Sequence, residues 1–294
     1  MAKYIPDISS RRWVIVAPSR IKRPDQDSKN NKKEEKCPLC PGNENMTPPE
    51  VYRVGEGDKN ASGWKVRVVP NKFSITDIHE VIVHSPSHNH NLEDLPLDQV
   101  KLIFATYRER FNFYRKSGQV MIFCNSGERA GASLQHSHSQ LVVLPWQINL
   151  DTLLREPLAN LVLDNTYFNV YCPDFSQWPY EVWVAPKVYI KKYGDISDDQ
   201  IEDLAKIIIW LISRLKKIHS KSQFVNIPFS YNYYIYPKAD WYLRLIPRFV
   251  HRAGFELGTG LQVNVIDPCQ AAEDYKGGKE KIEKVMTKLK LKIR

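Results

Sequence analysis

The sequence predicts an α+β protein of two similar units, each an antiparallel sheet packed by one long helix, related by pseudo-twofold symmetry. The main observation is an internal repeat. Residues 66–86 (VRVVPNKFSITDIHEVIVHSP) resemble residues 168–186 (FNVYCPDFSQWPYEVWVAP) at an offset of about 101 residues. Each copy predicts two short strands around a turn that contains proline and Phe-Ser. We therefore expect two domains, residues 1–150 and residues 151–294.

An amphipathic helix follows the repeat in each copy. Residues 95–117 and residues 196–220 carry apolar side chains at helical spacing. The pairs Leu97-Asp98 and Ser197-Asp198 are typical of helix starts. This second observation predicts one long helix for each sheet.

Further strands follow each predicted helix, and both end in an apolar residue and a proline. They are QLVVLP at 140–145 and YLRLIP at 242–247. The chain from Cys269 onward predicts a short linker and a basic C-terminal helix.

The composition is that of a globular protein with an excess of positive charge. Of the 294 residues, 43% are hydrophobic and 26% are charged, and the net charge is +9. This charge favours anionic ligands such as phosphate esters, nucleotides or nucleic acid, although a solvated loop and a basic surface helix account for much of it. Arg20 and Arg23 in RIKRP are candidate phosphate contacts, with a solvated surface pair as the alternative.

The sequence contains no sign of a membrane segment. No apolar run approaches the roughly 20 residues of a membrane span. The first ten residues, MAKYIPDISS, lack the apolar core of a signal peptide. We therefore expect a cytoplasmic protein that does not bind membranes.

Cys37 and Cys40 form a CxxC pair in the segment CPLCPGNEN. An odd total of five cysteines argues against a disulfide framework. Two thiolates at this spacing can chelate zinc if two further ligands complete a tetrahedron; two structural thiols are the alternative. The following Pro-Gly argues against a thioredoxin-like redox helix. Spacing alone does not choose the remaining ligands among the candidate histidines, which are His79, His84, His88, His90, His136 and His138.

The stretch SLQHSHSQLVVLP places His136, His138 and Gln140 at alternate positions before an apolar run. In a β-strand, alternate side chains lie on one face at intervals of about 7 Å, whereas in a helix residues two apart point in different directions. The run of Leu and Val favours a strand, and Pro145 would end it. The three polar side chains are therefore expected to share one site.

The second copy lacks this row, because Lys238, Asp240 and Tyr242 stand at the equivalent positions. One half is thus expected to carry the chemistry, while the other provides a scaffold or a substrate wall. A neutral imidazole beside a metal-anchored strand suits nucleophilic attack on phosphorus. The small-residue loop NSGERAGAS at 125–133 can present backbone N–H groups and the Ser133 hydroxyl to a phosphate.

These motifs resemble the galactose-1-phosphate uridylyltransferase family of the histidine-triad superfamily. The resemblance spans nearly the whole chain, and the doubled organisation matches the family's two histidine-triad-like repeats. It implies a ping-pong nucleotidyltransferase of the EC 2.7.7 type in galactose and carbohydrate metabolism, acting as a homodimer. Such an enzyme exchanges a nucleoside monophosphate, in the first place UMP, between a UDP-hexose such as UDP-glucose and a hexose 1-phosphate. The matching blocks are RRWVIVAPSRIKRP, CPLCPGNE, HEVIVHSPSH, FCNSGERAGASLQHSHSQ, PYEVWVAPK and FELGTGLQV.

The resemblance also implies roles for single residues. His138 would be the nucleophile that forms a covalent nucleotidyl-histidine, and Gln140 would hydrogen-bond the transferred phosphoryl group. One structural zinc ion per chain would be held by Cys37, Cys40, His88 and His136. The N-terminal copy would thus contain the zinc knuckle and the catalytic strand, and the degenerate C-terminal copy would contribute substrate contacts. The implied substrate-binding residues are Arg20, Arg23, Asn71, Asn125, Ser133, Glu256 and Gln262.

Three departures from the family pattern bear on the substrate. The segment DWYLRLIP lacks the histidines of a second metal site, so no second metal is expected. Lys72 replaces an acidic residue near the ribose, and HSHSQ, FELGTG and DWYL also resemble ADP-glucose phosphorylases. The alternative function is therefore an ADP-sugar or dinucleotide phosphorylase that uses inorganic phosphate as the acceptor.

A nucleic-acid-binding protein with a zinc knuckle is a third interpretation, from a different functional class. It leaves the HxHxQ row unexplained, and the basic residues lack the interleaved aromatic residues of a single-strand binding surface. No nucleic-acid partner is therefore expected.

Overall fold

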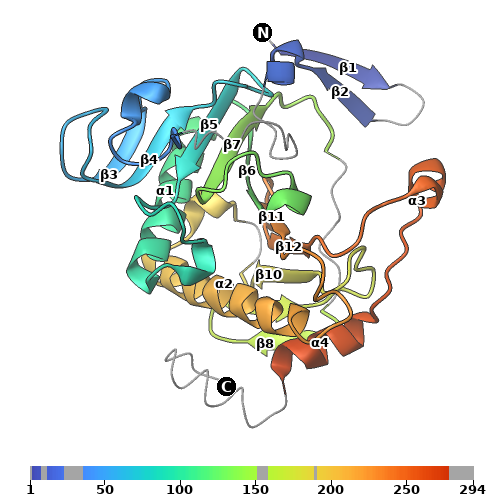
Figure 1. Cartoon of the computed structure of the whole chain (residues 1–294). Coiled ribbons are helices and arrows are strands. Elements are labelled where there is room, and N and C mark those ends of the chain that lie inside the picture. Colours follow the sequence, from blue (N-terminus) through green and yellow to red (C-terminus); the bar gives the residue numbers. More distant parts are fainter. Residues whose placement is uncertain (1, 8–11, 23–35, 151–157, 189–190, 278–294) are drawn as a thin grey trace.

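The computed structural model describes residues 2–7, 12–22, 36–150, 158–188 and 191–277. Strands β1 (Lys3–Asp7) and β2 (Arg12–Val16) pair as an antiparallel hairpin that stands apart from the main sheet (Figure 1). No helix within the described ranges is long and apolar enough to cross a membrane.

The main sheet, counted over the described residues, has ten strands in the order β3-β4-β5-β7-β6-β11-β12-β10-β9-β8. Every pairing in it is antiparallel. The first five strands along the chain are β3 (Tyr52–Gly55), β4 (Trp64–Pro70), β5 (Ile78–Val83), β6 (Gln119–Ser126) and β7 (His138–Leu144). The other five are β8 (Leu161–Asp164), β9 (Phe168–Tyr171), β10 (Val182–Pro186), β11 (Tyr231–Ile235) and β12 (Leu243–Pro247).

The two halves of the sheet have the same strand order. Read inward from its own edge, the first half runs β3-β4-β5-β7-β6 and the second runs β8-β9-β10-β12-β11. The halves join where β6 pairs with β11, with Cys124 opposite Tyr233. The α+β class is therefore confirmed, and this repeated order is consistent with the predicted pseudo-twofold relation.

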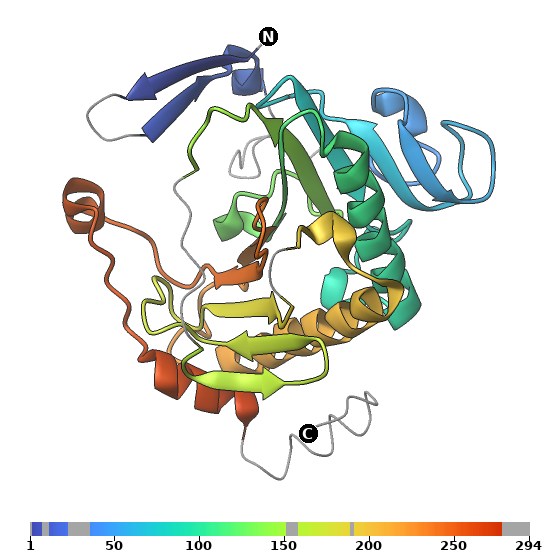
Figure 2. The same ribbon diagram turned by 180° about the vertical axis from the view of Figure 1, so that it is seen from behind.

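Two long helices cover one face of the sheet, as Figures 1 and 2 show from opposite sides. They are α1 (Leu97–Tyr114) and α2 (Asp198–His219), close to the predicted ranges. α2 begins where the Ser197 hydroxyl accepts a hydrogen bond from the Gln200 backbone N–H at 3.2 Å, which satisfies one of the unpaired donors at a helix start. Apolar side chains of both helices and both halves of the sheet form one core.

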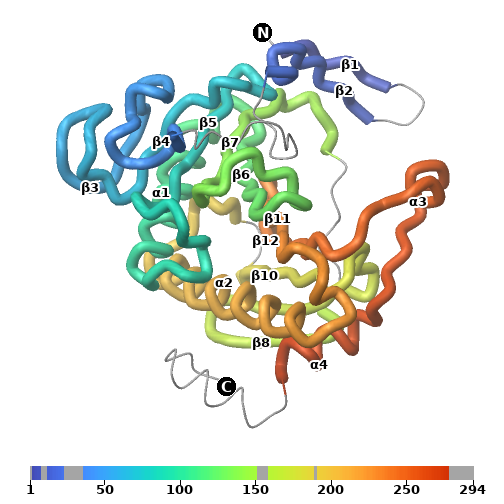
Figure 3. Tube along the Cα trace, viewed as in Figure 1, coloured from blue at the N-terminus to red at the C-terminus, as the bar shows by residue number. Residues whose placement is uncertain are grey.

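The shorter helices lie in the connections. In the described part of the chain, five are 3-10 helices: η1 (Pro18–Lys22), η2 (Glu44–Met46), η3 (Leu92–Asp94), η4 (Glu128–Ala130) and η5 (Tyr193–Asp195). The α-helix α3 (Gly254–Thr259) lies on an arm that leaves the sheet after β12 and returns to α4 (Pro268–Lys276), and Figure 3 shows its path.

The structure corrects the expected C-terminal linker. Cys269 lies inside α4, because the Asp267 carboxylate caps this helix by accepting hydrogen bonds from the backbone N–H groups of Cys269 and Gln270 at 2.8 and 3.3 Å. The expected basic helix falls at residues 278–294, which lie outside the described residues.

Candidate active site and metal centre

The polar row lies where β7 begins, and β7 pairs with β5 on one side and β6 on the other. His138 is the first residue of β7, and Gln140 lies two residues further on the same face. Their side chains are only 8% and 6% exposed. His136 was expected on the same strand, but it precedes β7. Its carbonyl accepts a hydrogen bond from His138 Nδ1 at 2.8 Å, so this peptide turns toward the histidine ring instead of continuing the sheet.

This hydrogen bond sets the proton position on His138. A backbone carbonyl only accepts hydrogen bonds, so the nitrogen that faces it, Nδ1, carries the proton. In the neutral ring, Nε2 is then the basic nitrogen. Such a nitrogen has the lone pair that nucleophilic catalysis requires.

His138 and Gln140 border a pocket whose remaining walls are largely apolar. Arg20 contributes a cation from η1, and its guanidinium donates a hydrogen bond to the Phe73 carbonyl at 2.6 Å. Ser133 and Asn71 also line the pocket. The other lining residues are Pro38, Leu39, Met46, Thr47, Pro48, Val69, Pro70, Lys72, Phe73, Val81 and Leu134. A largely apolar pocket with a few polar groups is typical of a small-molecule site.

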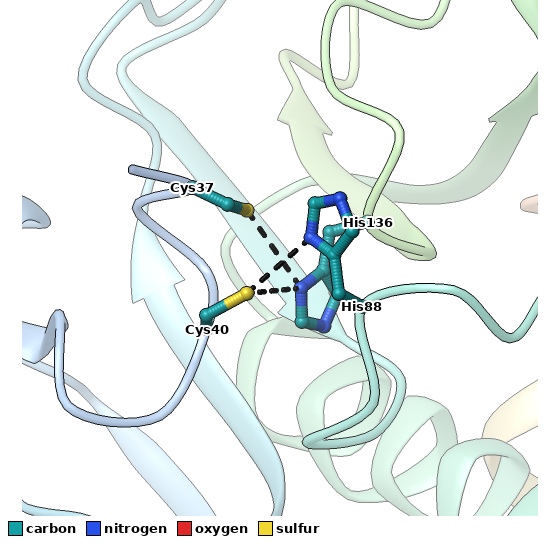
Figure 4. Close-up of side chains that lie close together, drawn as sticks. All are labelled: Cys37, Cys40, His88 and His136. Carbon is teal, nitrogen blue, oxygen red and sulfur yellow. Dashed lines mark hydrogen bonds between the residues drawn. The ribbon is translucent and has the colours of Figure 1, made fainter. Parts of the chain in front are cut away.

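Four side chains that could hold a metal ion meet next to this pocket (Figure 4): Cys37, Cys40, His88 and His136. Their ligand atoms lie within 4.8 Å of one another. The Cys40 sulfur is 3.3 Å from His88 Nδ1 and 3.5 Å from His136 Nδ1, and the Cys37 sulfur is 3.7 Å from His136 Nδ1. Zinc bonds of about 2.0–2.3 Å in a tetrahedron place ligand atoms about 3.3–3.8 Å apart, so this spacing fits zinc.

The protonation states of the four side chains also favour the binding of a metal cation. His136 Nε2 faces the Ser85 carbonyl at 2.8 Å and must carry the proton, so Nδ1 is left to bind a metal. Burial, aided by the nearby His88 and His138, lowers the pKa of His136 to about 4 and keeps the ring neutral. Burial likewise raises the pKa of the Cys37 thiol to about 11. A bound zinc ion would displace such thiol protons and compensate two partly buried thiolates.

A buried glutamate holds the cysteine turn in place. Glu44 accepts hydrogen bonds from the Gly42 backbone N–H and the Trp64 indole, both at 2.9 Å. Gly42 adopts a φ of +87°, which favours glycine at this turn. Although burial opposes ionisation, these hydrogen bonds and nearby Arg67 leave the pKa of Glu44 below its usual value.

Other residues predicted for the site lie elsewhere. Asn125 is on β6, where its side-chain oxygen accepts a hydrogen bond from Asn232 at 2.9 Å, and it does not line the pocket. Glu256 and Gln262 lie on the arm around α3, which Figures 1 and 2 show well away from β7. Both side chains make local hydrogen bonds: Glu256 accepts from the Ala253 N–H, and Gln262 donates to the Gly260 carbonyl. Arg23 lies outside the described residues.

Two buried histidines adjoin the row, and the sequence analysis gave them no role beyond possible metal binding. His79 contacts Gln140 on the pocket side, and His84 contacts Ser137 and Ser139. The signal that could have separated them is strand alternation in HEVIVH, because residues five apart on a strand point to opposite faces.

Stacked aromatic rings lie on the corresponding face of the second half. Tyr242, which the sequence repeat aligns with Gln140, stacks between Trp183 and Tyr236, with ring centroids at 4.0 and 5.0 Å. Beside this stack, the buried Arg244 guanidinium pairs with Glu181 at 2.7 Å. These buried side chains pack against one another on this face.

Comparison with known proteins relates this arrangement to sugar-nucleotide enzymes. The model of the galactose-1-phosphate uridyl transferase N-terminal domain matches residues 76–145. An ADP-glucose phosphorylase of Arabidopsis thaliana is 28% identical over 326 residues, covering 91% of this chain and 90% of that protein. A galactose-1-phosphate uridylyltransferase of Thermotoga maritima is 23% identical over 307 residues, covering 90% and 94%.

Solved structures share the fold. The crystal structure of the Arabidopsis thaliana ADP-glucose phosphorylase with bound ADP-glucose has a TM-score of 0.70 at 24% identity, covering 95% of this chain and 99% of that one. A uridylyltransferase structure has a TM-score of 0.72 at 23% identity, covering 96% and 99%. The matched segment and the relatives show that the chain resembles the galactose-1-phosphate uridylyltransferase family, with similarity to ADP-glucose phosphorylases, and it shares their fold.

Proposed function

We propose that the protein is a hexose-1-phosphate nucleotidylyltransferase that moves a nucleoside monophosphate, in the first place UMP, between a UDP-hexose and a hexose 1-phosphate through His138. The observation that carries this proposal is the geometry of His138 in the pocket. Its Nδ1–H bond to the His136 carbonyl makes Nε2 the nucleophilic nitrogen, and Gln140 stands two residues away on the same face.

The reaction proceeds as a double displacement. His138 Nε2 attacks the α-phosphorus of the nucleotide sugar, an N–P bond forms, and the P–O bond to the sugar 1-phosphate breaks. A phosphate oxygen of the incoming sugar 1-phosphate then attacks the same phosphorus and releases the imidazole. The His136 carbonyl stabilises the positive charge that the ring acquires in the intermediate.

The surrounding residues are proposed to bind the substrate. The Gln140 amide donates to a phosphoryl oxygen, with Ser133 and Arg20 at the same pocket. Asn71 and the apolar lining hold the nucleoside. Arg23, Asn125, Glu256 and Gln262 complete the proposed phosphate and sugar contacts.

We further propose one structural zinc ion per chain and a homodimer. Four protein ligands leave a tetrahedral ion no open position, so zinc would anchor His136 and the start of β7 without touching the phosphorus. In a dimer, the arm that carries Glu256 and Gln262 would reach a site from the neighbouring subunit. Its exposed apolar side chains favour such a contact; they include Phe255, Leu257 and Leu261.

A phosphorylase is the second candidate. It uses the same nucleotidyl-His138 but takes inorganic phosphate as the acceptor and an ADP-sugar as the donor. The 28% identity to an ADP-glucose phosphorylase over 91% of the chain supports it.

The test is to trap the covalent intermediate. The protein is incubated with UDP-glucose or ADP-glucose carrying a label in the α-phosphate, and the labelled peptide is identified. We expect label on His138 from one of the two donors, and its loss in His138→Ala. Wild-type protein that takes up no label from either donor would contradict the proposed chemistry.

The acceptor is then identified by discharging the labelled protein. Galactose 1-phosphate should return the label as nucleotide sugar if the protein is a transferase, whereas inorganic phosphate should release it as nucleoside diphosphate if it is a phosphorylase. Cys269→Ser, an exposed cysteine outside the metal group, serves as the matched control and should label normally.

A further inference from the structure

A buried histidine beside Gln140 plays no part in the chemistry described so far. His79 lies on β5 and is only 4% exposed. In the β5–β7 pairing, His79 stands opposite Val142, and Gln140 stands opposite Val81. His79 and Gln140 are thus diagonal neighbours on one face, close enough for long side chains to touch.

The contacts of His79 fix its tautomer. The backbone N–H of Ile75 donates to His79 Nδ1 at 3.0 Å. Because a backbone N–H can only donate, Nδ1 is unprotonated and the proton of the neutral ring is on Nε2. That nitrogen lies 2.9 Å from Gln140 Oε1, to which it therefore donates.

A second donor converges on the same oxygen. The Asn71 side-chain oxygen accepts a hydrogen bond from the Phe73 backbone N–H at 2.8 Å, so the orientation of its amide is fixed. The Asn71 amide nitrogen then lies 3.4 Å from Gln140 Oε1. It is also 3.1 Å from His79 Nε2; because both nitrogens carry protons, neither accepts from the other, and both N–H groups point to the one oxygen. Two donors thus hold the Gln140 oxygen, which leaves the Gln140 amide NH₂ free to turn toward the phosphoryl group.

We propose that His79 is a positioning residue that keeps the Gln140 amide NH₂ turned toward the transferred phosphoryl group. This inference rests on the proposed function of the pocket. Without the His79 donor, the Gln140 carboxamide can rotate by half a turn. Its oxygen would then face the anionic phosphoryl oxygens, and a hydrogen bond would be replaced by repulsion.

Two substitutions separate this role from a purely structural one. In His79→Gln, the amide nitrogen reaches the place of Nε2 and keeps the donor to Gln140, but the acceptor for Ile75 is lost. In His79→Asn, the side-chain oxygen reaches the place of Nδ1 and keeps the bond to Ile75, but the donor to Gln140 is lost. Each variant therefore keeps one of the two His79 contacts and loses the other, and both introduce a carboxamide side chain.

The readout is the single-turnover rate of label transfer to His138 from the nucleotide sugar that labels the wild type. We expect His79→Asn to be about 10- to 100-fold slower, less than the roughly 10²–10³-fold loss when a donor is removed, because Gln140 is still present, and we expect His79→Gln to recover most of that loss. Adding His79→Asn to Gln140→Ala should cause little further loss, because both act through one amide. The opposite order of the two variants, or full additivity, would overturn the proposal.

A spectroscopic measurement tests the same inference without activity. Long-range ¹H–¹⁵N correlation of the wild-type protein should show His79 protonated on Nε2 and unprotonated on Nδ1, with the signals assigned by their loss in His79→Asn. A proton on Nδ1 would refute the positioning role even if His138 labels normally. If His138 takes up no label, the nucleotidyl-transfer proposal fails, and the tautomer still decides whether His79 orients Gln140.

Discussion

His84 contacts the reactive strand from the side opposite the pocket. Its Nδ1 lies 2.9 Å from the Ser137 hydroxyl and its Nε2 lies 2.6 Å from the Ser139 hydroxyl, so it holds the residues on both sides of His138. Nε2 is also 3.0 Å from the Tyr107 hydroxyl. The pKa of this fully buried ring lies well below its usual 6.5, and nearby His138 and His136 contribute to the lowering. Burial is the main cause, because the charged ring would be desolvated.

This depressed pKa predicts acid sensitivity. Below pH 6.5 the unfolded chain takes up a proton at His84 that the folded chain excludes. The contribution of His84 is therefore fully present above pH 6.5 and is lost on acidification, by up to about 1.4 kcal/mol per pH unit. Urea unfolding between about pH 7.5 and 5 should show a shallower dependence in His84→Gln than in the wild type.

The matched control for this titration is His90→Gln. His90 is exposed, and its Nδ1 lies 2.7 Å from the hydroxyl of nearby Ser87. We expect this variant to keep the wild-type slope. If His84→Gln also keeps it, the acid sensitivity arises elsewhere.

At the scale of elements, the cysteine turn connects the metal group to β7. Cys37 and His136 are separated by 99 positions in the chain, yet their ligand atoms lie 3.7 Å apart. The turn also packs on the sheet through Leu39, which shares a small apolar cluster with Trp64 and Val83. An ion held here would join the turn, the His88 loop and the start of β7.

Zinc content therefore tests this element. Purified wild-type protein should contain about one zinc ion per chain, and Cys37→Ser should contain much less, since a serine hydroxyl is a poor zinc ligand. Elemental analysis measures the content, and chelation of the wild type should lower its melting temperature. Cys269→Ser provides the control and should retain zinc. Equal zinc content in both variants would refute the assignment.

The sequence predicted these elements better than it predicted their contacts. The helical spacing placed α1 and α2 within a few residues of their observed bounds, because apolar periodicity reports directly on a buried helix face. Alternation correctly put His138 and Gln140 on one face, but it also extended the strand to His136. The side-chain bond from His138 to the His136 carbonyl is invisible to a period-two pattern.

The sequence pattern also could not choose the metal-ligating histidines, because that choice depends on tertiary contacts. From the residues alone, spacing left six metal-ligand candidates, because the ligands meet only after β5, β7 and the cysteine turn have packed. The resemblance selected His88 and His136, and the structure brings those two together with Cys37 and Cys40. The role of His79 depends on one backbone N–H in the turn at Ile75, which no sequence pattern reveals.

At the scale of the whole molecule, one continuous sheet holds two halves with the same strand order and different contents. In the first half, the side chains at the start of β7 line a pocket. In the second half, the equivalent face is filled by stacked rings and by the buried Arg244–Glu181 pair. We infer that the halves divide the work: the first carries the chemistry and the second stabilises the shared sheet.

Substitution at equivalent positions tests this division. Tyr242→Ala removes a fully buried ring from the stack and should lower the free energy of unfolding by about 3–5 kcal/mol, while His138 of the folded protein still takes up label at the wild-type rate. Gln140→Ala should do the reverse, with a large loss of labelling rate and a stability loss of about 1–3 kcal/mol from the donors left unpaired. Urea unfolding and single-turnover labelling at a temperature where both variants are folded measure the two effects. A slow but stable Tyr242→Ala variant would mean that the second half takes part in the reaction, and the division of labour between the halves would have to be abandoned.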